Sequence, residues 1–362
     1  MKRITAFGFA AIVFLHVVEA NAHIIGEEAH HHPPAKYDSS VKPPVVARFA
    51  QAKNTTPPSK ENITKIVVPA PAAIFAPFAP KVSTRWDDRF FYVESDAMPD
   101  HQMMVGITAW QQQVPIPQNY SGDNAWRFPL QPVAAANPLS AKSNFFRGAI
   151  ALAANGVPIF NPIKNDGRTD TFLAGELDEF GGHAGRADDY HYHTAPVHLQ
   201  KLVGVGKPVA YALDGYAIYG FTEPDGAPAG KLDSFNGHTT PALGYHYHAT
   251  KTYPYLNGGF HGEVVERDGQ VDPQPRAQGL REALPPLHGA RITGFTFPKT
   301  NSYSLQYQVG GETRYVNYIL NPDKTARFDF VDGKGQVRTE SYSRQQRRGG
   351  QPRPNSKESP KP

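Results

Sequence analysis

The 362-residue chain contains no cysteine. It can therefore form no disulfide bond, no thiolate metal site and no cysteine nucleophile. It also has no apolar run beyond its N-terminal end that approaches the ~20 residues needed to cross a bilayer. Any structural staple must come from packing of the chain or from a bound metal ion.

The chain has little net charge, with a formal value of +4. Residues 344–362 hold six lysines and arginines against one glutamate, a net of +5, so the remainder is close to neutral at −1. This tail is rich in Pro, Gly, Ser and Gln without apolar periodicity, so we expect it to be disordered. It is suited only to weak contact with anionic polymers of the cell envelope. No nucleic-acid-binding motif is present.

The N-terminal residues have the pattern of an export signal. Lys2 and Arg3 precede an apolar run of 15 residues, Ile4–Val18, and a small-x-small sequence ends at Ala22. We predict a cleaved signal peptide over residues 1–22, no membrane span, and a secreted or periplasmic protein. Residues 23–84 are rich in Pro, Ala and His, and we expect a disordered linker there.

The sequence Tyr-His-Tyr-His occurs twice, at residues 190–193 and 245–248. Ten of 17 positions are identical between residues 177–193 and 232–248, including a third histidine eight residues before each pair. Histidine is the commonest metal ligand among side chains that titrate near neutral pH. The candidate metal ligands are His183, His191, His193, His238, His246 and His248.

The similarity extends upstream, so the chain contains two copies of one unit, 149–196 and 209–251. Asn155-Gly156 and Asp214-Gly215 lie at matching positions between short apolar runs, a strong signal for a β-hairpin. Each copy is predicted to form a hairpin, a Gly-rich loop with one histidine, and a strand with two.

Alternate residues of a strand point to opposite faces. His191 and His193 should therefore share one face, and so should the second pair. If the two copies pair about a pseudo-two-fold axis, all four imidazoles can converge on one site, with His183 and His238 close by. Such a site suits zinc, copper, iron or nickel rather than calcium or magnesium. The alternative is that these histidines are structural and bind backbone carbonyls in a polar core.

Five further residues are candidates for outer ligands or supporting contacts. His101, His198 and His261 lie in turns or in a short predicted helix, from which chain folding must return them to the site. Asp178 and Asp233 occupy matching positions five residues before a histidine, where they either orient that histidine or cap the loop through an Asx-turn. Asp188 and Asp189 have no counterpart in the second copy and are expected to face solvent.

The two Tyr-His-Tyr-His strings, together with Leu-Asp-x-Phe-x-Gly-His, resemble the YHYH-domain family of exported bacterial proteins. The resemblance covers Arg85 to Glu266 and includes 98–101 and Trp110–Pro115. It implies a shared domain and export, and it supplies no reaction. We assign residues 85–288 to this domain.

The expected fold is mainly β, antiparallel and loop-rich. Residues 289–343 alternate apolar and polar residues between Gly-Gly and Asp-Gly turns, so they predict a small C-terminal antiparallel β module. The 32 glycines and 34 prolines also favour many turns over long helices.

Three classes of function remain open. The first is an exported protein with a closed metal site of four or more protein ligands. The second is a metal-dependent enzyme with an open coordination position, for which Glu176 and Glu179 lie near the first copy only. The third is a cell-envelope or glycan-binding module that uses aromatic residues such as Trp110, Trp126, Tyr253 and Tyr255.

Overall fold

The computed structural model describes residues 68–343. The predicted signal peptide, the linker up to residue 67 and the basic tail from residue 344 lie outside this range. No helix among residues 68–343 is long and apolar enough to cross a membrane.

Ordered structure begins earlier than predicted. Residues 68–84, which we assigned to a disordered linker, contain helix α1 (Ala72–Phe75), the 3-10 helix η1 (Ala76–Phe78) and the first residues of strand β1 (Ser83–Trp86). Ile74 and Phe75 are each 1% exposed, and Phe75 stacks on Phe91 with ring centroids 5.7 Å apart. The linker assignment is wrong here because these apolar side chains bury despite the surrounding prolines.

The described residues are mainly β, as expected. The other helical turns are η2 (Gly122–Asn124), η3 (Val197–Leu199) and α2 (Gln200–Val203). The strands are β1 (Ser83–Trp86), β2 (Phe90–Glu94), β3 (Trp126–Pro129), β4 (Ala134–Ser140), β5 (Ala149–Ala153), β6 (Pro158–Phe160), β7 (Gly182–Ala184), β8 (Tyr190–Tyr192), β9 (Ala210–Ala212), β10 (Ala217–Tyr219), β11 (Gly237–Thr240), β12 (Gly244–His248), β13 (Gly259–Gly262), β14 (Glu266–Arg267), β15 (Gln270–Val271), β16 (Arg291–Lys299), β17 (Ser302–Val309), β18 (Glu312–Leu320), β19 (Thr325–Val331) and β20 (Val337–Ser343).

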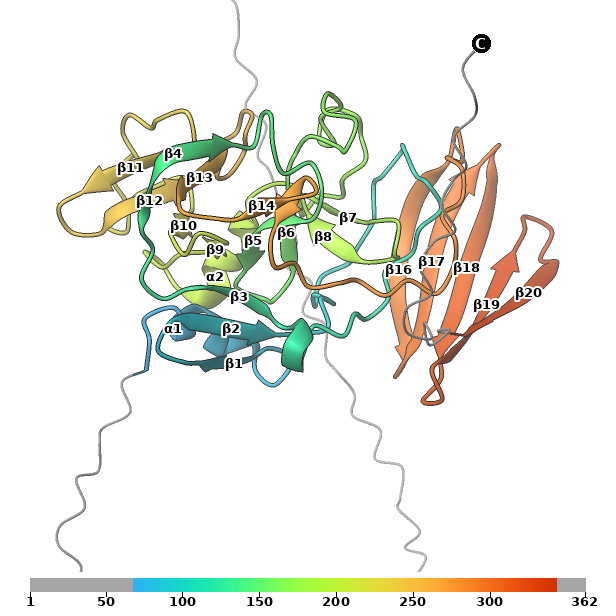
Figure 1. Cartoon of the computed structure of the whole chain (residues 1–362). Coiled ribbons are helices and arrows are strands. Elements are labelled where there is room, and N and C mark those ends of the chain that lie inside the picture. The colour runs from blue at the N-terminus through green and yellow to red at the C-terminus, as the bar shows by residue number, and fades with distance from the viewer. Residues whose placement is uncertain (1–67, 344–362) are drawn as a thin grey trace, which may run out of the picture. The chain divides into compact units, whose positions relative to one another are not determined.

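One eight-stranded sheet holds both Tyr-His-Tyr-His strings. Its strand order is β11-β12-β10-β9-β5-β6-β8-β7 (Figure 1). The second-copy strands β11, β12, β10 and β9 correspond to the first-copy strands β7, β8, β6 and β5, so the order is symmetric about the β9–β5 pair. The two copies join where β5 pairs antiparallel with β9. The sheet is mixed rather than purely antiparallel, because β6–β8 and β10–β12 are parallel pairs. A long loop and a hairpin strand separate the members of each parallel pair along the chain.

The centre of this sheet is entirely apolar. All five residues of β5 are buried, and the register places Ala151 opposite Ala212 and Leu152 opposite Tyr211. The small alanine side chains on both strands leave room for the aromatic residues that pack above and below them, such as Phe128, whose ring stacks on Tyr211 at 5.0 Å.

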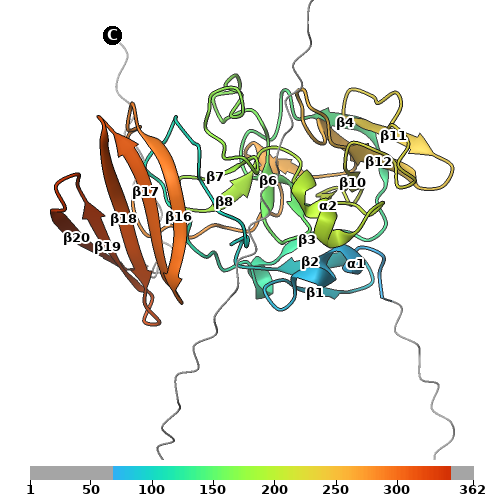
Figure 2. The ribbon, with the colours of Figure 1, turned by 180° about the vertical axis from the view of Figure 1, so that it is seen from behind.

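The C-terminal strands β16–β20 form a separate antiparallel sheet in chain order, visible from both sides in Figure 1 and Figure 2. The predicted hairpins are present there. Tyr318 of β18 donates a hydrogen bond to the carbonyl of Pro115.

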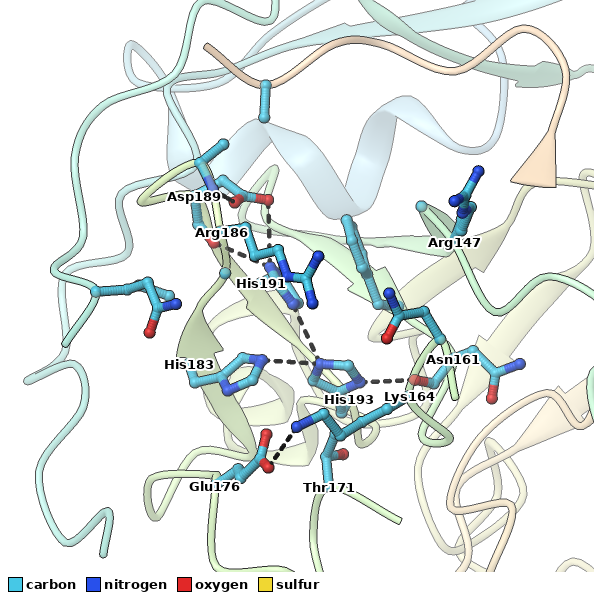
Figure 3. A pocket seen from close by; sticks show the side chains of 18 of the residues that line it. Arg147, Asn161, Lys164, Thr171, Glu176, His183, Arg186, Asp189, His191 and His193 are labelled. Atoms are coloured by element: carbon cyan, nitrogen blue, oxygen red, sulfur yellow. Dashed lines mark hydrogen bonds and ion pairs between the residues drawn. The ribbon is translucent and has the colours of Figure 1, made fainter. Parts of the chain in front are cut away.

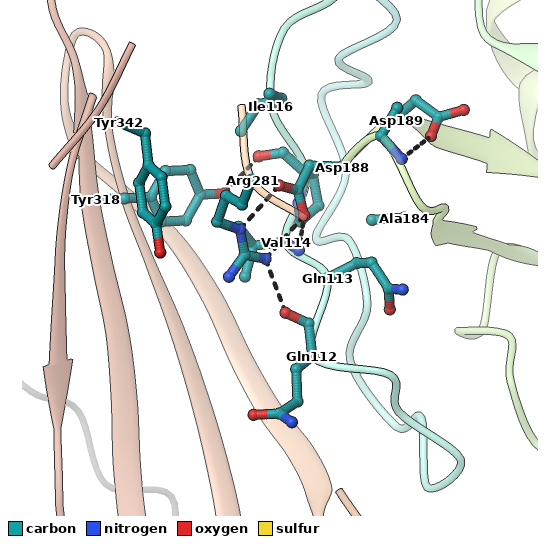
Figure 4. Close-up of polar contacts among 12 residues, drawn as sticks. Gln112, Gln113, Val114, Ile116, Ala184, Asp188, Asp189, Arg281, Tyr318 and Tyr342 are labelled. Atoms are coloured by element: carbon teal, nitrogen blue, oxygen red, sulfur yellow. Dashed lines mark hydrogen bonds and ion pairs between the residues drawn. The ribbon is translucent and has the colours of Figure 1, made fainter. Parts of the chain in front are cut away.

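A buried ion pair lies between the first copy and the segment that precedes β16 (Figure 4). Arg281 binds Asp188 with Nη2–Oδ1 at 2.8 Å, and their side chains are only 4% and 3% exposed. Arg281 also donates to the carbonyl of Gln112 at 2.8 Å. The prediction that Asp188 and Asp189 face solvent is therefore wrong, because both are buried.

Two candidate metal centres

The first cluster consists of the three histidines of the first copy. His183 lies on β7 directly opposite His191 on β8, and His193 follows one residue after β8 ends. The Nε2 atom of His193 lies 3.1 Å from Nε2 of His191 and 3.1 Å from Nε2 of His183. All three rings thus aim the same nitrogen at one point (Figure 3).

The opposite nitrogens face backbone carbonyls. Nδ1 of His191 is 2.9 Å from the oxygen of Asp189, and Nδ1 of His193 is 2.7 Å from the oxygen of Asn161. His183 has a corresponding interaction with the backbone of Glu176. A carbonyl only accepts, so each Nδ1 carries the proton and each Nε2 presents a lone pair.

Three converging lone pairs cannot satisfy one another, and a cation between them would resolve the conflict. With metal–nitrogen bonds of about 2.0–2.1 Å, neighbouring ligand nitrogens lie roughly 2.8–3.0 Å apart in octahedral and roughly 3.3–3.4 Å apart in tetrahedral geometry, values that lie on either side of the observed 3.1 Å. Metal-bound histidines commonly donate their other N–H to a carbonyl. The alternative of structural histidines accounts for the Nδ1 contacts and leaves the convergence unexplained.

Burial favours the neutral imidazoles that a metal requires. It lowers the pKa of His183 and of His193 well below the usual value, and the neighbouring histidines lower it further.

The second cluster contains the matching histidines and one carboxylate. His238 on β11 lies opposite His246 on β12, with Nε2 atoms 3.1 Å apart, and His248 ends the same strand. Glu223 reaches all three: its Oε1 is 2.8 Å from Nε2 of His238 and 3.4 Å from Nε2 of His248, and its Oε2 is 3.3 Å from Nε2 of His246.

The supporting contacts of the second cluster repeat those of the first. Nδ1 of His246 is 3.0 Å from the oxygen of Gly244, and Nδ1 of His248 is 3.0 Å from the oxygen of Gly220. Nε2 of His248 is buried and makes no hydrogen bond to any described residue. An unsatisfied buried nitrogen of this kind fits a metal ligand.

The fourth position differs between the copies. Aligned without a gap from Phe160 and Tyr219, Lys164 corresponds to Glu223. Both residues open a turn, their N–H groups donating to the carbonyls of Thr169 and Ala227 at 2.9 and 2.8 Å. Lys164 points to Glu176 instead of the histidines' shared point, with Nζ–Oε1 at 2.6 Å. Sequence reasoning missed Glu223, although extending the alignment past Tyr219 would have located the position.

A cavity of about 380 Å³ opens over the first cluster and is lined by all three of its histidines. In the second cluster the Glu223 carboxylate occupies the position facing the three Nε2 atoms. The first cluster thus has three protein donors and an accessible side, whereas the second has four.

The histidines do not converge on one shared site. Among the described residues they form two groups, one per copy, and strands β6, β5, β9 and β10 separate β8 from β12. Five strand spacings of about 4.8 Å place the two strands roughly 24 Å apart. The shared-site expectation is wrong because the copies join through β5 and β9 rather than through the histidine strands.

His101, His198 and His261 belong to neither group. His101 and His198 lie on the opposite side of β8, where their Nε2 atoms are 2.8 and 3.5 Å from the hydroxyl of Tyr192 beside a cavity of about 250 Å³. Burial lowers the pKa of each to about 4. His261 stacks on Tyr245 with centroids 3.6 Å apart.

The matching aspartates cap their loops and hold the first tyrosine of each motif. Asp178 accepts from the backbone N–H of Phe180 and Gly182 and from the Tyr190 hydroxyl, the last at 2.7 Å. Asp233 makes the same set of contacts in the second copy, with its tyrosine at 2.8 Å. Of the two predicted roles, these contacts match loop capping.

The fold and the two clusters define a mainly β protein with two buried histidine groups that can hold metal ions. Residues 125–229 match the family described as YHYH protein, so the chain carries a YHYH domain and the resemblance seen in the sequence is confirmed. The matched stretch is shorter than 85–288 and includes the first cluster's histidines but not those of the second. No curated protein and no solved structure gives a significant match.

Proposed function

We propose that the protein binds two transition-metal ions, one in each copy of a tandem duplication. The observation that supports this most is the convergence of three Nε2 lone pairs at 3.1 Å while the Nδ1 atoms face carbonyls. The donor set of imidazoles, with one carboxylate in the second copy, suits zinc, copper, iron or nickel.

The second centre has a structural role. Glu223 completes four protein donors around one point, and closed four-ligand sites are typical of ions that stabilise a fold. The ion would link the edge strand β11 and strand β12 to the loop after β10, because His238, His246 and His248 lie on the two strands and Glu223 lies in that loop.

The first centre is a candidate reaction site, because three protein donors face a cavity and leave a position for a ligand. A metal ion there would supply Lewis acidity or an activated water. Lys164 and Glu176 would provide a paired ammonium and carboxylate beside it. The glycan-binding alternative has no comparable support, since Trp110 and Trp126 are buried.

We further propose that the protein is exported, on the pattern of residues 1–22. Mass spectrometry of protein from its native host should find a mature N-terminus at His23. A retained Met1 would contradict both export and the proposed secreted or periplasmic location.

The metal proposal is tested by elemental analysis of the full chain after incubation with each of the four metals. Wild type should retain two ions, His183→Ala and His238→Ala one each, and the double variant none. His288→Ala, an exposed histidine outside both clusters, is the matched control and should retain two. A wild type without stoichiometric metal would overturn the proposal, and loss of both ions in either single variant would refute two independent centres.

A further inference from the structure

One of the differences between the two copies decides which group can occupy the position beside the three histidines of each cluster. Glu223 supplies a carboxylate between 2.8 and 3.4 Å from the three Nε2 atoms of its cluster. At the equivalent position of the first copy stands Lys164, which binds Glu176. The first centre therefore has the same three imidazoles as the second but no carboxylate of its own directed at their shared point.

The charges around the first cavity favour an anion. Lys164 and Glu176 compensate each other at 2.6 Å. Arg147, Arg186 and Asp189 also line the cavity (Figure 3). Asp189 lies against His191, with its Oδ2 3.4 Å from Nδ1, whereas neither arginine forms an ion pair within residues 68–343. Three basic side chains against two acidic ones give the lining a net charge of +1. An ion held by three neutral imidazoles would keep its full positive charge, whereas Glu223 compensates part of it in the second centre.

The walls favour an organic ligand over a simple inorganic ion. Trp110, Phe160 and Ile107 contribute apolar surface, and Phe160 stacks on His191 with centroids 3.9 Å apart. The volume of about 380 Å³ lies in the range of small-molecule sites. Gln270 and Gln274 also line the cavity, and the amide of Gln274 is held by the backbone N–H and carbonyl of Ala149.

We propose that this cavity binds a small organic carboxylate whose oxygen takes the coordination position that Glu223 fills in the second copy. This inference rests on the proposed metal site. The apolar body of the ligand packs against the aromatic wall, and the two unpaired arginines attract its negative charge.

Isothermal titration of the zinc-loaded full chain with benzoate tests the proposal, with benzamide as its neutral counterpart. Wild type should bind one benzoate per chain and at least tenfold less benzamide, and protein stripped of zinc should lose benzoate binding. Lys164→Glu should place a carboxylate as in the second copy, keep two zinc ions and lower benzoate affinity at least tenfold. Lys201→Glu makes the same charge change on exposed α2 and should leave binding unchanged.

A second variant keeps the test decisive if Lys164→Glu does not fold. Glu223→Ala removes a group the size of acetate from the second centre, so zinc-loaded protein should bind two acetates per chain instead of one. Stoichiometric zinc with equal affinity for benzoate and benzamide would overturn the inference and leave the metal sites standing. Tighter binding of inorganic phosphate than of benzoate would refute the carboxylate assignment. Failure to bind zinc, copper, iron or nickel would instead remove the underlying metal proposal.

Discussion

Replacing Arg281 with methionine should destabilise the protein far more than removal of an ordinary surface ion pair. Asp188 is 2% exposed, and the remaining hydrogen bond of its carboxylate is the one from the N–H of Val114 at 3.0 Å. Methionine fills similar volume but leaves this carboxylate without its counter-charge. Breaking a buried pair from one side costs about 3–5 kcal/mol. For a domain of this size that corresponds to a fall in Tm of roughly 6–20 °C.

The structure provides a matched control. Arg267 and Asp272 form an ion pair at 3.3 Å, with side chains 68% and 33% exposed. Arg267→Met should therefore change the free energy of unfolding by about 0–1 kcal/mol. The double variant Asp188→Asn/Arg281→Met should lose about 1–3 kcal/mol less than the sum of its single variants, because each single change leaves a buried partner behind.

Urea and thermal unfolding of the zinc-loaded proteins would measure these differences. The effect should reach the first centre as well, because Asp188 immediately precedes Asp189, whose carbonyl binds Nδ1 of His191. If Arg281→Met costs no more than Arg267→Met, the pair does not hold the C-terminal segment on the first copy, and the assigned role is refuted.

Tyr190→Phe should lower the free energy of unfolding by about 1–3 kcal/mol, because the Asp178 carboxylate that it leaves unpaired is buried. Tyr245→Phe should lower it less, because Asp233 is exposed, and equal urea midpoints for the two variants would contradict this. Burial raises the pKa of Asp214 from 3.8 to about 6. The protonated Asp214 carboxyl therefore contributes its full stabilisation below pH 3.8, and this contribution is lost as pH rises through about 6. Asp214→Asn should flatten the dependence of unfolding free energy on pH in this window. An unchanged curve would refute the raised pKa of Asp214. Zinc at a hundredfold excess over its Kd should stabilise the protein by about 2.7 kcal/mol for each occupied site. Calorimetry should show the total stabilisation of the two sites halved in His183→Ala and in His238→Ala, and absent in the double variant.

Local features of this fold could be predicted from sequence. The alternation of the Tyr-His-Tyr-His strings places the histidines on one face, and the Gly-Gly and Asp-Gly turns delimit C-terminal strands, because both depend on neighbouring residues. The pairing of β5 with β9 joins residues about 60 positions apart, and no local pattern specifies it. The number of histidine centres depends on that pairing, so the single shared site was predicted wrongly.

The fourth member of the second cluster was missed for a different reason. Glu223 lies in the loop after β10, with no histidine nearby in sequence. Only the pairing of β10 with β12 brings it to the cluster. Asp188 was misassigned because two consecutive aspartates indicate a solvent-exposed segment unless a buried partner is known. That partner, Arg281, lies 93 residues away.

The β5–β9 contact also bears on how such a sheet can arise. A chain with one copy would leave the fully apolar β5 as an unpaired edge strand, which invites association with another chain. Two identical single-copy chains could pair through that edge about a true two-fold axis, in an isologous contact. In the present chain both halves of the sheet belong to one polypeptide, so the two halves can differ in sequence. The exchange of glutamate for lysine at the fourth position is a difference that no symmetric homodimer could sustain.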